Sequence, residues 1–221
     1  MISIIIPTLN EARALPATLT RVFEQKGDYE VIIADGGSDD ETLKCLDDYK
    51  NIKLVTAKQG RASQMNAGAA KASGDWLLFL HADALLPDNA LAVISQQKAK
   101  AGGFRHRFSG KAWGLRLVSW LHNFRCSRTG VFYGDQAMFI RRSLFASMNG
   151  FPDVQNLEDL LFSEKLLTVT TPVFLKQEVI SDSRKFEQQG IWLCLLRVIL
   201  IQICHELKLP PPTRKFFASV R

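Results

Sequence analysis

Short apolar runs that lack polar alternation are the feature that most constrains how this chain folds. Ser3–Leu9, Tyr29–Asp35 and Trp76–Leu80 carry aliphatic residues on consecutive positions, a pattern typical of parallel strands covered on both faces. Helical apolar patterns lie between these runs, including an alanine-rich stretch over residues 62–72. The order strand, loop, helix therefore predicts an α/β fold with a Rossmann-like, mostly parallel central sheet flanked by helices.

Further elements follow from local patterns. The acidic residues Asp39, Asp40 and Glu41 are expected to open a helix, because negative charge is favoured in a first turn. Pro87 is expected at another helix start. The other expected elements are a strand over 52–57, an edge or half-exposed strand over 102–109, a strand running into a helix over 134–145, a helix over 156–167 and a strand over 172–181.

Polar clusters follow the four expected N-terminal strands at the point where each strand ends. They are TLNEA (8–12), DGGSDD (35–40), KQGRASQMN (58–66) and HAD (81–83). In open α/β sheets ligands bind beyond the carboxyl ends of the strands. Four loops that converge on one sheet edge therefore predict a ligand site there.

The length of 221 residues predicts a single domain with a C-terminal helical extension. Within it we expect an α/β half (1–98), a less regular second half (99–186) and an apolar helix with a tail (187–221). Gly190–Cys204 is too short and too polar to span a bilayer. Two interpretations stay open for it: a buried or dimer-packing helix, or an interfacial membrane-binding helix assisted by Arg214 and Lys215.

The net charge of +6 favours anionic partners. Residues 98–128 contain eight Lys or Arg and no Asp or Glu, so they form either a surface for an anionic acceptor or membrane, or a solvated basic face. No nucleic-acid-binding module is recognisable, and we expect no nucleic-acid partner. Four widely spaced cysteines and an N-terminus without a signal-peptide pattern predict free thiols and a cytoplasmic location, including the inner face of the membrane.

Individual motifs each allow a structural and a functional interpretation. DGGSDD is either a glycine-rich turn with a helix cap or a ligand loop in which Asp35 contacts a base or ribose. It is not G-x-G-x-x-G, which argues against a nicotinamide dehydrogenase. Arg61, Gln64 and Asn66 either begin a helix or contact phosphate and base.

The remaining charged motifs also allow both a structural and a functional interpretation. His81 and Asp83 follow a buried strand, where Asp83 either caps a turn or binds the Mg²⁺ or Mn²⁺ that a diphosphate requires. Glu158 and Asp159 begin a helix, and they either compensate its dipole or supply a general base. Arg184 and Lys185, in the motif SDSRKFEQQG, form either a diphosphate clamp or a solvated surface.

Taken together, SIIIPTLNEA, VIIADGGSDDET, GRASQMNAGA, GDWLLFLHADALLP and EDLLFSEKL closely resemble the family-2 nucleotide-sugar glycosyltransferases of the type-A glycosyltransferase fold. Order and spacing match over about residues 3–167. A narrower resemblance links the chain to a short bacterial subgroup found near radical-SAM proteins and associated with arsenosugar biosynthesis.

The resemblance implies inverting transfer of a sugar from a nucleoside diphosphate donor to an acceptor hydroxyl, assisted by Mn²⁺ or Mg²⁺. It implies that the half 1–98 binds the nucleotide sugar and that the half 99–186 binds the acceptor and carries the catalytic residues. It assigns Asp159 as general base with Glu158 beside it, and Asp83 as the metal ligand. His81 stands where a first Asp is usual, which leaves strict metal dependence open and favours Mn²⁺. The nucleotide pocket would comprise Pro7, Asn10, Glu11, Asp35, Arg61, Gln64 and Asn66.

Two other classes remain in view from the sequence. A sugar-phosphate nucleotidyltransferase would carry a glycine-rich triphosphate loop after the first strand, and PTLNEA lacks one. A non-catalytic nucleotide- or membrane-binding module would not need a base at Asp159. The sugar, the nucleotide, the acceptor and the oligomeric state do not follow from the sequence.

Overall fold

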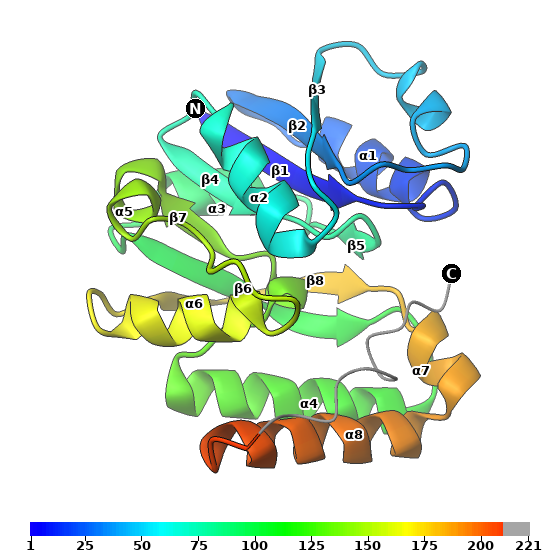
Figure 1. Cartoon of the computed structure of the whole chain (residues 1–221), viewed down its shortest axis with the longest axis vertical. Helices are drawn as coiled ribbons and strands as arrows, with labels where there is room; N and C mark the ends of the chain where they lie inside the picture. Colours follow the sequence, from blue (N-terminus) through cyan, green and yellow to red (C-terminus); the bar gives the residue numbers. More distant parts are fainter. Residues whose placement is uncertain (210–221) are drawn as a thin grey trace.

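The computed structural model describes residues 1–209 as one α/β domain built on an eight-stranded sheet in the order β3-β2-β1-β4-β7-β6-β8-β5 (Figure 1). The expected fold class, including the C-terminal helical extension, is confirmed. The strands are β1 (Ile2–Thr8), β2 (Tyr29–Asp35), β3 (Ile52–Thr56), β4 (Trp76–Phe79), β5 (Ala84–Leu85), β6 (Ala101–Phe108), β7 (Phe139–Arg141) and β8 (Val173–Ser181).

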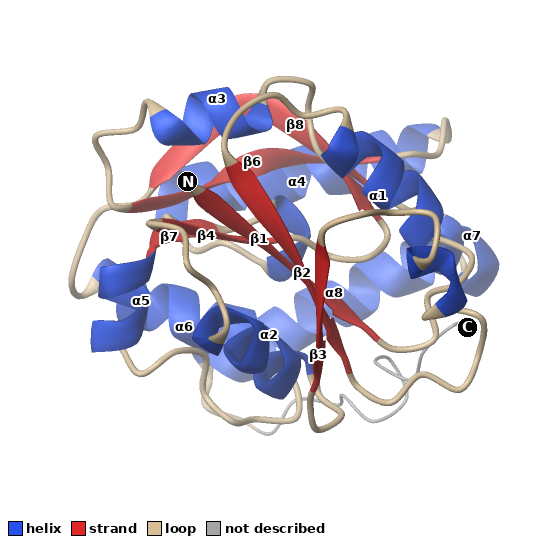
Figure 2. Cartoon of the chain, turned by 90° about the horizontal axis from the view of Figure 1, so that it is seen from above, coloured by secondary structure: helices blue, strands red, loops and turns tan. Residues whose placement is uncertain are grey.

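Helices cover both faces of this sheet (Figure 2). They are α1 (Leu15–Phe23), α2 (Arg61–Ala70), α3 (Ala90–Ser95), α4 (Trp113–Thr129), α5 (Arg142–Ser147), α6 (Glu158–Leu167), α7 (Arg184–Gln189) and α8 (Ile191–Glu206), with short 3₁₀ turns η1 (Lys44–Leu46) and η2 (Gly134–Gln136). Successive side chains of a strand point to opposite faces. Accordingly Ile4 and Ile6 of β1 join the core under α1, whereas Ile5 joins the core under α2.

The first four strands of the sheet order, β3, β2, β1 and β4, are parallel. Their carboxyl ends therefore meet at one edge, as the sequence predicts. The other half of the sheet is mixed: β7 runs antiparallel to β4 and β6, β8 is parallel to β6, and β5 is antiparallel to β8. Sheet pairing across β4 and β7 joins the two halves of the chain into one sheet.

The expectation of an edge or half-exposed strand at 102–109 is wrong. β6 lies between β7 and β8, and it is largely buried. Its pairing with β7 ends at Gly102, and beyond that point α4 covers the free side of the strand. Asn123 donates to the carbonyl of His106 and accepts from its amide, both at 2.8 Å, so a side chain replaces a neighbouring strand.

Two expected helix starts are also wrong. No helix begins at Asp39–Glu41, because Asp40 accepts a hydrogen bond from the Thr42 amide at 2.9 Å and Asp39 bonds with Asn10, so the loop forms turns instead. Only η1 follows. Pro87 lies three residues before α3, and its carbonyl accepts from the Ala90 amide.

The C-terminal helix expected from Gly190–Cys204 is confirmed as α8, and it lies beside α4 (Figure 1). Trp113 and Trp192 connect the two helices with ring centroids 5.0 Å apart. Within residues 1–209 no helix is both long enough and apolar enough to cross a membrane. The tail beyond Leu209, including Arg214 and Lys215, lies outside the described residues.

Candidate functional site

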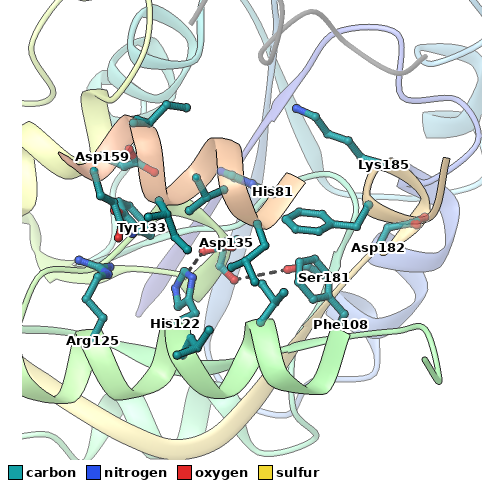
Figure 3. Close-up of a pocket in the computed structure, with 18 of the residues that line it drawn as sticks. His81, Phe108, His122, Arg125, Tyr133, Asp135, Asp159, Ser181, Asp182 and Lys185 are labelled. Atoms are coloured by element: carbon teal, nitrogen blue, oxygen red, sulfur yellow. Dashed lines mark hydrogen bonds and ion pairs between the residues drawn. The ribbon is translucent and has the colours of Figure 1, made fainter. Parts of the chain in front are cut away.

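A cavity of about 360 Å³ lies between the sheet edge and helices α4, α7 and α8 (Figure 3). Its apolar wall comes mainly from α4 and α8, through residues such as Leu121, Leu195 and Ile199. Its polar wall comes from loops at strand ends, from helix termini and from polar residues within α4 and α8. The polar and charged lining residues are Arg61, His81, Asp83, His122, Arg125, Tyr133, Asp135, Asp159, Ser181, Asp182, Lys185 and Gln202.

Arg61 and Glu158 form an ion pair at this cavity, with Arg61 Nε 2.9 Å from Glu158 Oε1. The Glu158 side chain is only 2% exposed, whereas that of Arg61 is 40% exposed and lines the cavity. Burial raises the pKa of Glu158, and the nearby Asp159 adds to this, while Arg61 opposes it. Burial lowers the pKa of Arg61, but Glu158 and Asp159 outweigh this effect and the pKa is raised.

Asp159 and His81 converge on Gly134, which begins η2. Asp159 Oδ2 accepts a hydrogen bond from the Gly134 amide at 2.6 Å. A Cβ atom on Gly134 would lie 2.5 Å from His81 Nε2 and 3.3 Å from Asp159 Oδ2. Leu157, at φ 66°, is a left-handed residue that precedes α6. The local chain thus brings a carboxylate and an imidazole to the same point of the cavity wall.

Asp83 and Lys185 complete the group of predicted residues at the cavity. The Asp83 carbonyl accepts from the Asp182 amide at 3.1 Å, which joins the β4–β5 loop to the end of β8. Burial lowers the pKa of Lys185, and Arg61 lowers it further. Four chain segments therefore supply Arg61, His81, Asp83, Asp159 and Lys185 to one space.

Asp35 is buried and organises the loop that follows β2. Its carboxylate accepts hydrogen bonds from the amides of Gly37 and Ser38 at 2.8 and 2.9 Å, and from the Ser38 hydroxyl at 2.5 Å. Burial raises its pKa, but these bonds outweigh burial and the pKa is lowered. Asn10, at φ 57°, holds the same loop by exchanging hydrogen bonds with Asp39 at 2.6 and 2.9 Å.

Gln64 and Asn66 use their amides to bind the protein's own backbone. Gln64 Nε2 donates to the carbonyls of Thr8 and Ala34 at 2.7 and 3.0 Å, at the ends of β1 and β2. Asn66 exchanges two 2.9 Å hydrogen bonds with the main chain of Phe151. Both residues therefore position the loops around the sheet edge.

Three further predicted residues do not line the cavity, and neither do Asn10, Asp35, Gln64, Asn66 and Glu158. Pro7 is buried in β1 opposite Ala34. The Glu11 carbonyl accepts the amides of Ala14 and Leu15 at the start of α1. Arg184 pairs with Asp182, its Nε 2.5 Å from Oδ2, so of the predicted pair only Lys185 reaches the cavity.

Sequence reasoning missed a second polar group, formed by His106 on β6, His122 on α4 and Asp135 on η2. These residues come from segments whose spacing in the sequence gives no sign of proximity, and α4 itself was not expected. Burial lowers the pKa of His106 to about 4. Burial raises the pKa of Asp135, but His122 and His106 outweigh it, so the carboxylate stays charged.

Comparison with known proteins identifies the class. Residues 3–145 match Glycosyl transferase family 2, and the chain belongs to that family. It is 36% identical over 172 residues to a PGL/p-HBAD biosynthesis glycosyltransferase of Mycobacterium bovis, covering 68% of this chain and 63% of the relative. It is 28% identical over 155 residues to an undecaprenyl-phosphate 4-deoxy-4-formamido-L-arabinose transferase of Proteus mirabilis, covering 63% of this chain and 48% of that protein.

The chain thus spans less than two thirds of these relatives' length. Among solved structures, residues 1–349 of S. aureus TarS superpose over 92% of this chain and 65% of that segment, with a TM-score of 0.66 and 19% identity. The mannosyltransferase PcManGT from Pyrobaculum calidifontis, in complex with GDP-Man and Mn²⁺, covers 97% of this chain and 67% of its own, with a TM-score of 0.68 and 20% identity. At 19% and 20% identity these likenesses establish the fold alone, and the fold agrees with the family to which the chain belongs.

Proposed function

We propose that this protein is an inverting glycosyltransferase in which Asp159 removes the proton from the acceptor hydroxyl. The observation that carries the proposal is the convergence of Arg61, Asp83, Asp159 and Lys185 on one cavity. Displacement of a nucleoside diphosphate requires a carboxylate that removes the acceptor proton. It also requires cationic side chains and a metal-binding carboxylate at other points of the wall, which stabilise the departing charge. The half 1–98 then holds the donor and the half 99–186 holds the acceptor.

Asp159 suits the role of general base because its position is fixed by the backbone. Its Oδ2 accepts from the Gly134 amide, and its Oδ1 accepts from the Leu160 amide at 2.8 Å. A carboxylate retains further lone pairs for a substrate hydroxyl. Glu158 pairs with Arg61, so the positive charge of Arg61 is held away from the acceptor hydroxyl.

The residues at the donor end fit a divalent metal ion. Asp83 offers a hard carboxylate ligand and His81 an imidazole at the same cavity, a set that suits Mn²⁺ better than Mg²⁺. When bound, the ion would neutralise charge on the departing diphosphate. Arg61 and Lys185 would bind the same phosphates. The Mn²⁺ complex of PcManGT supports this assignment.

The nucleotide would lie beyond the carboxyl ends of β1 and β2, where Asn10 and Asp35 hold the loop. We infer that Asp35 acts by shaping this loop, because most of its lone pairs are already used. Gln64 and Asn66 likewise act as positioning residues. Pro7 and Glu11 border the same sheet edge. The narrower resemblance to the arsenosugar-associated subgroup rests on sequence motifs alone.

We infer that the acceptor is amphiphilic and is met at an anionic membrane surface on the inner face. The cavity has an apolar wall, and the neighbouring outer surfaces of α4 and α8 expose large apolar side chains beside Lys111, Arg116 and Arg128. The Proteus mirabilis relative is named for undecaprenyl phosphate, a polyprenyl lipid, which supports this choice. The exposed apolar residues are Trp113, Trp120, Leu121, Phe124, Trp192, Leu193, Leu196, Ile199, Leu200 and Ile203.

Vesicle binding tests the membrane part of the proposal. The protein should co-sediment with vesicles containing phosphatidylglycerol and not with phosphatidylcholine alone, and Leu196→Ser should weaken this binding. Val169→Ser is the matched control, because Val169 is also exposed but lies outside α4 and α8. If the protein is a dimer in solution and does not bind the vesicles, these helices would instead form a subunit interface.

A thermal-shift panel tests the enzymatic part. UDP, GDP, CDP, ADP and dTDP would each be added with Mn²⁺, Mg²⁺ or chelator, since a ligand that binds the folded state raises Tm. One nucleotide should raise Tm in a metal-dependent way, and Asp83→Ala should abolish the rise. Asp159→Asn should keep the rise but lower sugar transfer by about 10²-fold or more. Full transfer by Asp159→Asn would refute the assigned base.

A further inference from the structure

A second polar cluster lies at the base of the cavity, separate from the predicted donor residues. His106 Nε2 and His122 Nε2 each lie 3.6 Å from an oxygen of Asp135, one on each side of the carboxylate. One ligand atom from each of the three residues falls within 4.8 Å of the others. The three come from β6, α4 and η2, so the tertiary fold alone brings them together.

The polar atoms of this cluster lack partners within the described chain. Both ring nitrogens of His106, Nε2 of His122 and Oδ1 of Asp135 are buried without a hydrogen bond. The His106 side chain is only 1% exposed. Buried polar groups are almost always satisfied, because leaving them unpaired costs free energy. Several unpaired ligand atoms that face one another indicate a missing species between them.

The surrounding structure holds the cluster in place. The Asn123 carboxamide binds both main-chain groups of His106 at 2.8 Å and thereby fixes β6 beside His122 on α4. Gln136 donates to the Phe104 carbonyl at 3.2 Å and accepts from the Tyr133 amide at 3.1 Å, which fixes η2 against β6. Such support is typical of a preorganised site.

We propose that His106, His122 and Asp135 bind a divalent transition-metal ion of the zinc type, with its open coordination position facing the acceptor side of the cavity. Two imidazoles and one carboxylate form a ligand set used by zinc, which binds each at about 2.0–2.2 Å. Tetrahedral ligands at that distance are about 3.4 Å apart. Each imidazole lies 3.6 Å from its own oxygen of Asp135, His106 Nε2 from Oδ2 and His122 Nε2 from Oδ1, so the carboxylate faces both rings.

The open position follows from the lining of the cavity. His122 and Asp135 line it, whereas His106 lies behind them. In Figure 3, His122 and Asp135 point toward each other below His81, and Asp159 lies toward one end of the same space. Resting on the proposed function, the ion would hold an oxygen of the acceptor, while Asp83 serves the donor.

Cobalt titration of the full chain tests the site, because Co²⁺ substitutes for zinc and reports its coordination by visible absorption. Metal-stripped Asp83→Ala protein, in which the donor carboxylate is removed, should bind one Co²⁺ per chain with the intense bands of a four-coordinate ion. Zn²⁺ should displace it. His122→Gln and Asp135→Asn in this background should each weaken binding by at least about tenfold.

His205→Gln is the matched control, because His205 of α8 pairs with Glu164 of α6 and lies outside the cluster. It should leave Co²⁺ affinity unchanged. Circular dichroism checks that each variant is folded, and Zn²⁺ should raise the Tm of Asp83→Ala but not of the double variants. Folded Asp83→Ala that binds no Co²⁺, or binding that survives both cluster substitutions, would overturn the site. Both readouts are independent of sugar transfer, so failure of the proposed enzymatic function would leave this result intact.

Discussion

Arg61 Nε lies 2.9 Å from Glu158 Oε1, and this ion pair joins the first residue of α2 to the first residue of α6. The pair links the sheet edge at the carboxyl ends of the parallel strands to the helix that carries Asp159. A buried carboxylate loses its compensation when its partner is removed. The contact therefore couples the stability of the domain to the geometry of the cavity.

Arg61→Ala should lower the free energy of unfolding by about 2 kcal/mol, less than for a fully buried pair because Arg61 is 40% exposed. Urea denaturation measures this loss. Combining it with Glu158→Gln gives a double-mutant cycle, in which the double variant should lose less stability than the sum of the single variants. Strict additivity would show that the ion pair contributes no coupling.

Gly134→Ala should lower kcat/KM for sugar transfer by about 10²-fold, because small displacements of site residues cost that much. The new methyl group would meet His81 Nε2 at 2.5 Å and approach Asp159 Oδ2 at 3.3 Å. Steady-state kinetics measures the effect. Ser143→Ala, an exposed change on α5, is the control. Unchanged kcat/KM in Gly134→Ala would mean that the placement of His81 does not matter for the reaction.

Gln64→Leu separates a positioning role from direct nucleotide contact. The substitution leaves the buried carbonyls of Thr8 and Ala34 without the amide that binds them, so stability should fall by about 2 kcal/mol. Calorimetric Kd for the nucleoside diphosphate should change by less than about threefold in the folded variant. Gln59→Leu, at an exposed position before α2, should change neither quantity. Tenfold weaker binding of the nucleotide would instead show that Gln64 contacts it directly.

The parallel half of the fold could be predicted from the sequence because burial on both faces leaves a local signature. β1, β2 and β4 are short apolar runs. Asp35 ends β2, Arg61 begins α2 after β3, and Asp83 follows β4. The expected roles of Asp35, Gln64 and Asn66 were harder to judge. The same residue at the same position can bind the protein's own backbone or bind a ligand. The sequence does not separate these roles, and only the hydrogen bonds in the structure do.

The other half could not be predicted, for two physical reasons. α4 has apolar residues on two faces, with Leu115 and Val118 buried and Trp113 and Phe124 exposed, so no single stripe marks it as a helix. The alternation of aromatic and basic residues in β6 suggested exposure, yet α4 buries that strand. Because the site group around Asp135 depends on both elements, it remained hidden in the sequence.

Acid stability should depend on Glu30, which ties together three strands outside the cavity. Its carboxylate accepts from the Ser3 hydroxyl at 2.5 Å, the Ser73 amide at 2.6 Å and Lys53 Nζ at 2.6 Å. Burial raises the pKa of Glu30, but the bonds from Lys53, Ser3 and Ser73 outweigh burial and lower it to about 2.

Since the folded pKa lies below the unfolded one, the folded state holds its proton less tightly. The stabilisation by Glu30 is complete above the ordinary pKa of 4.5 and is lost as pH falls from there toward about 2. It should amount to about 3 kcal/mol. Urea denaturation between pH 5 and pH 2 should accordingly give a shallower pH dependence for Glu30→Gln than for the unmodified protein. Glu24→Gln, at an exposed carboxylate of the same charge, should leave the slope unchanged. Equal slopes for Glu30→Gln and the unmodified protein would mean that the strand network does not depend on the charge of Glu30.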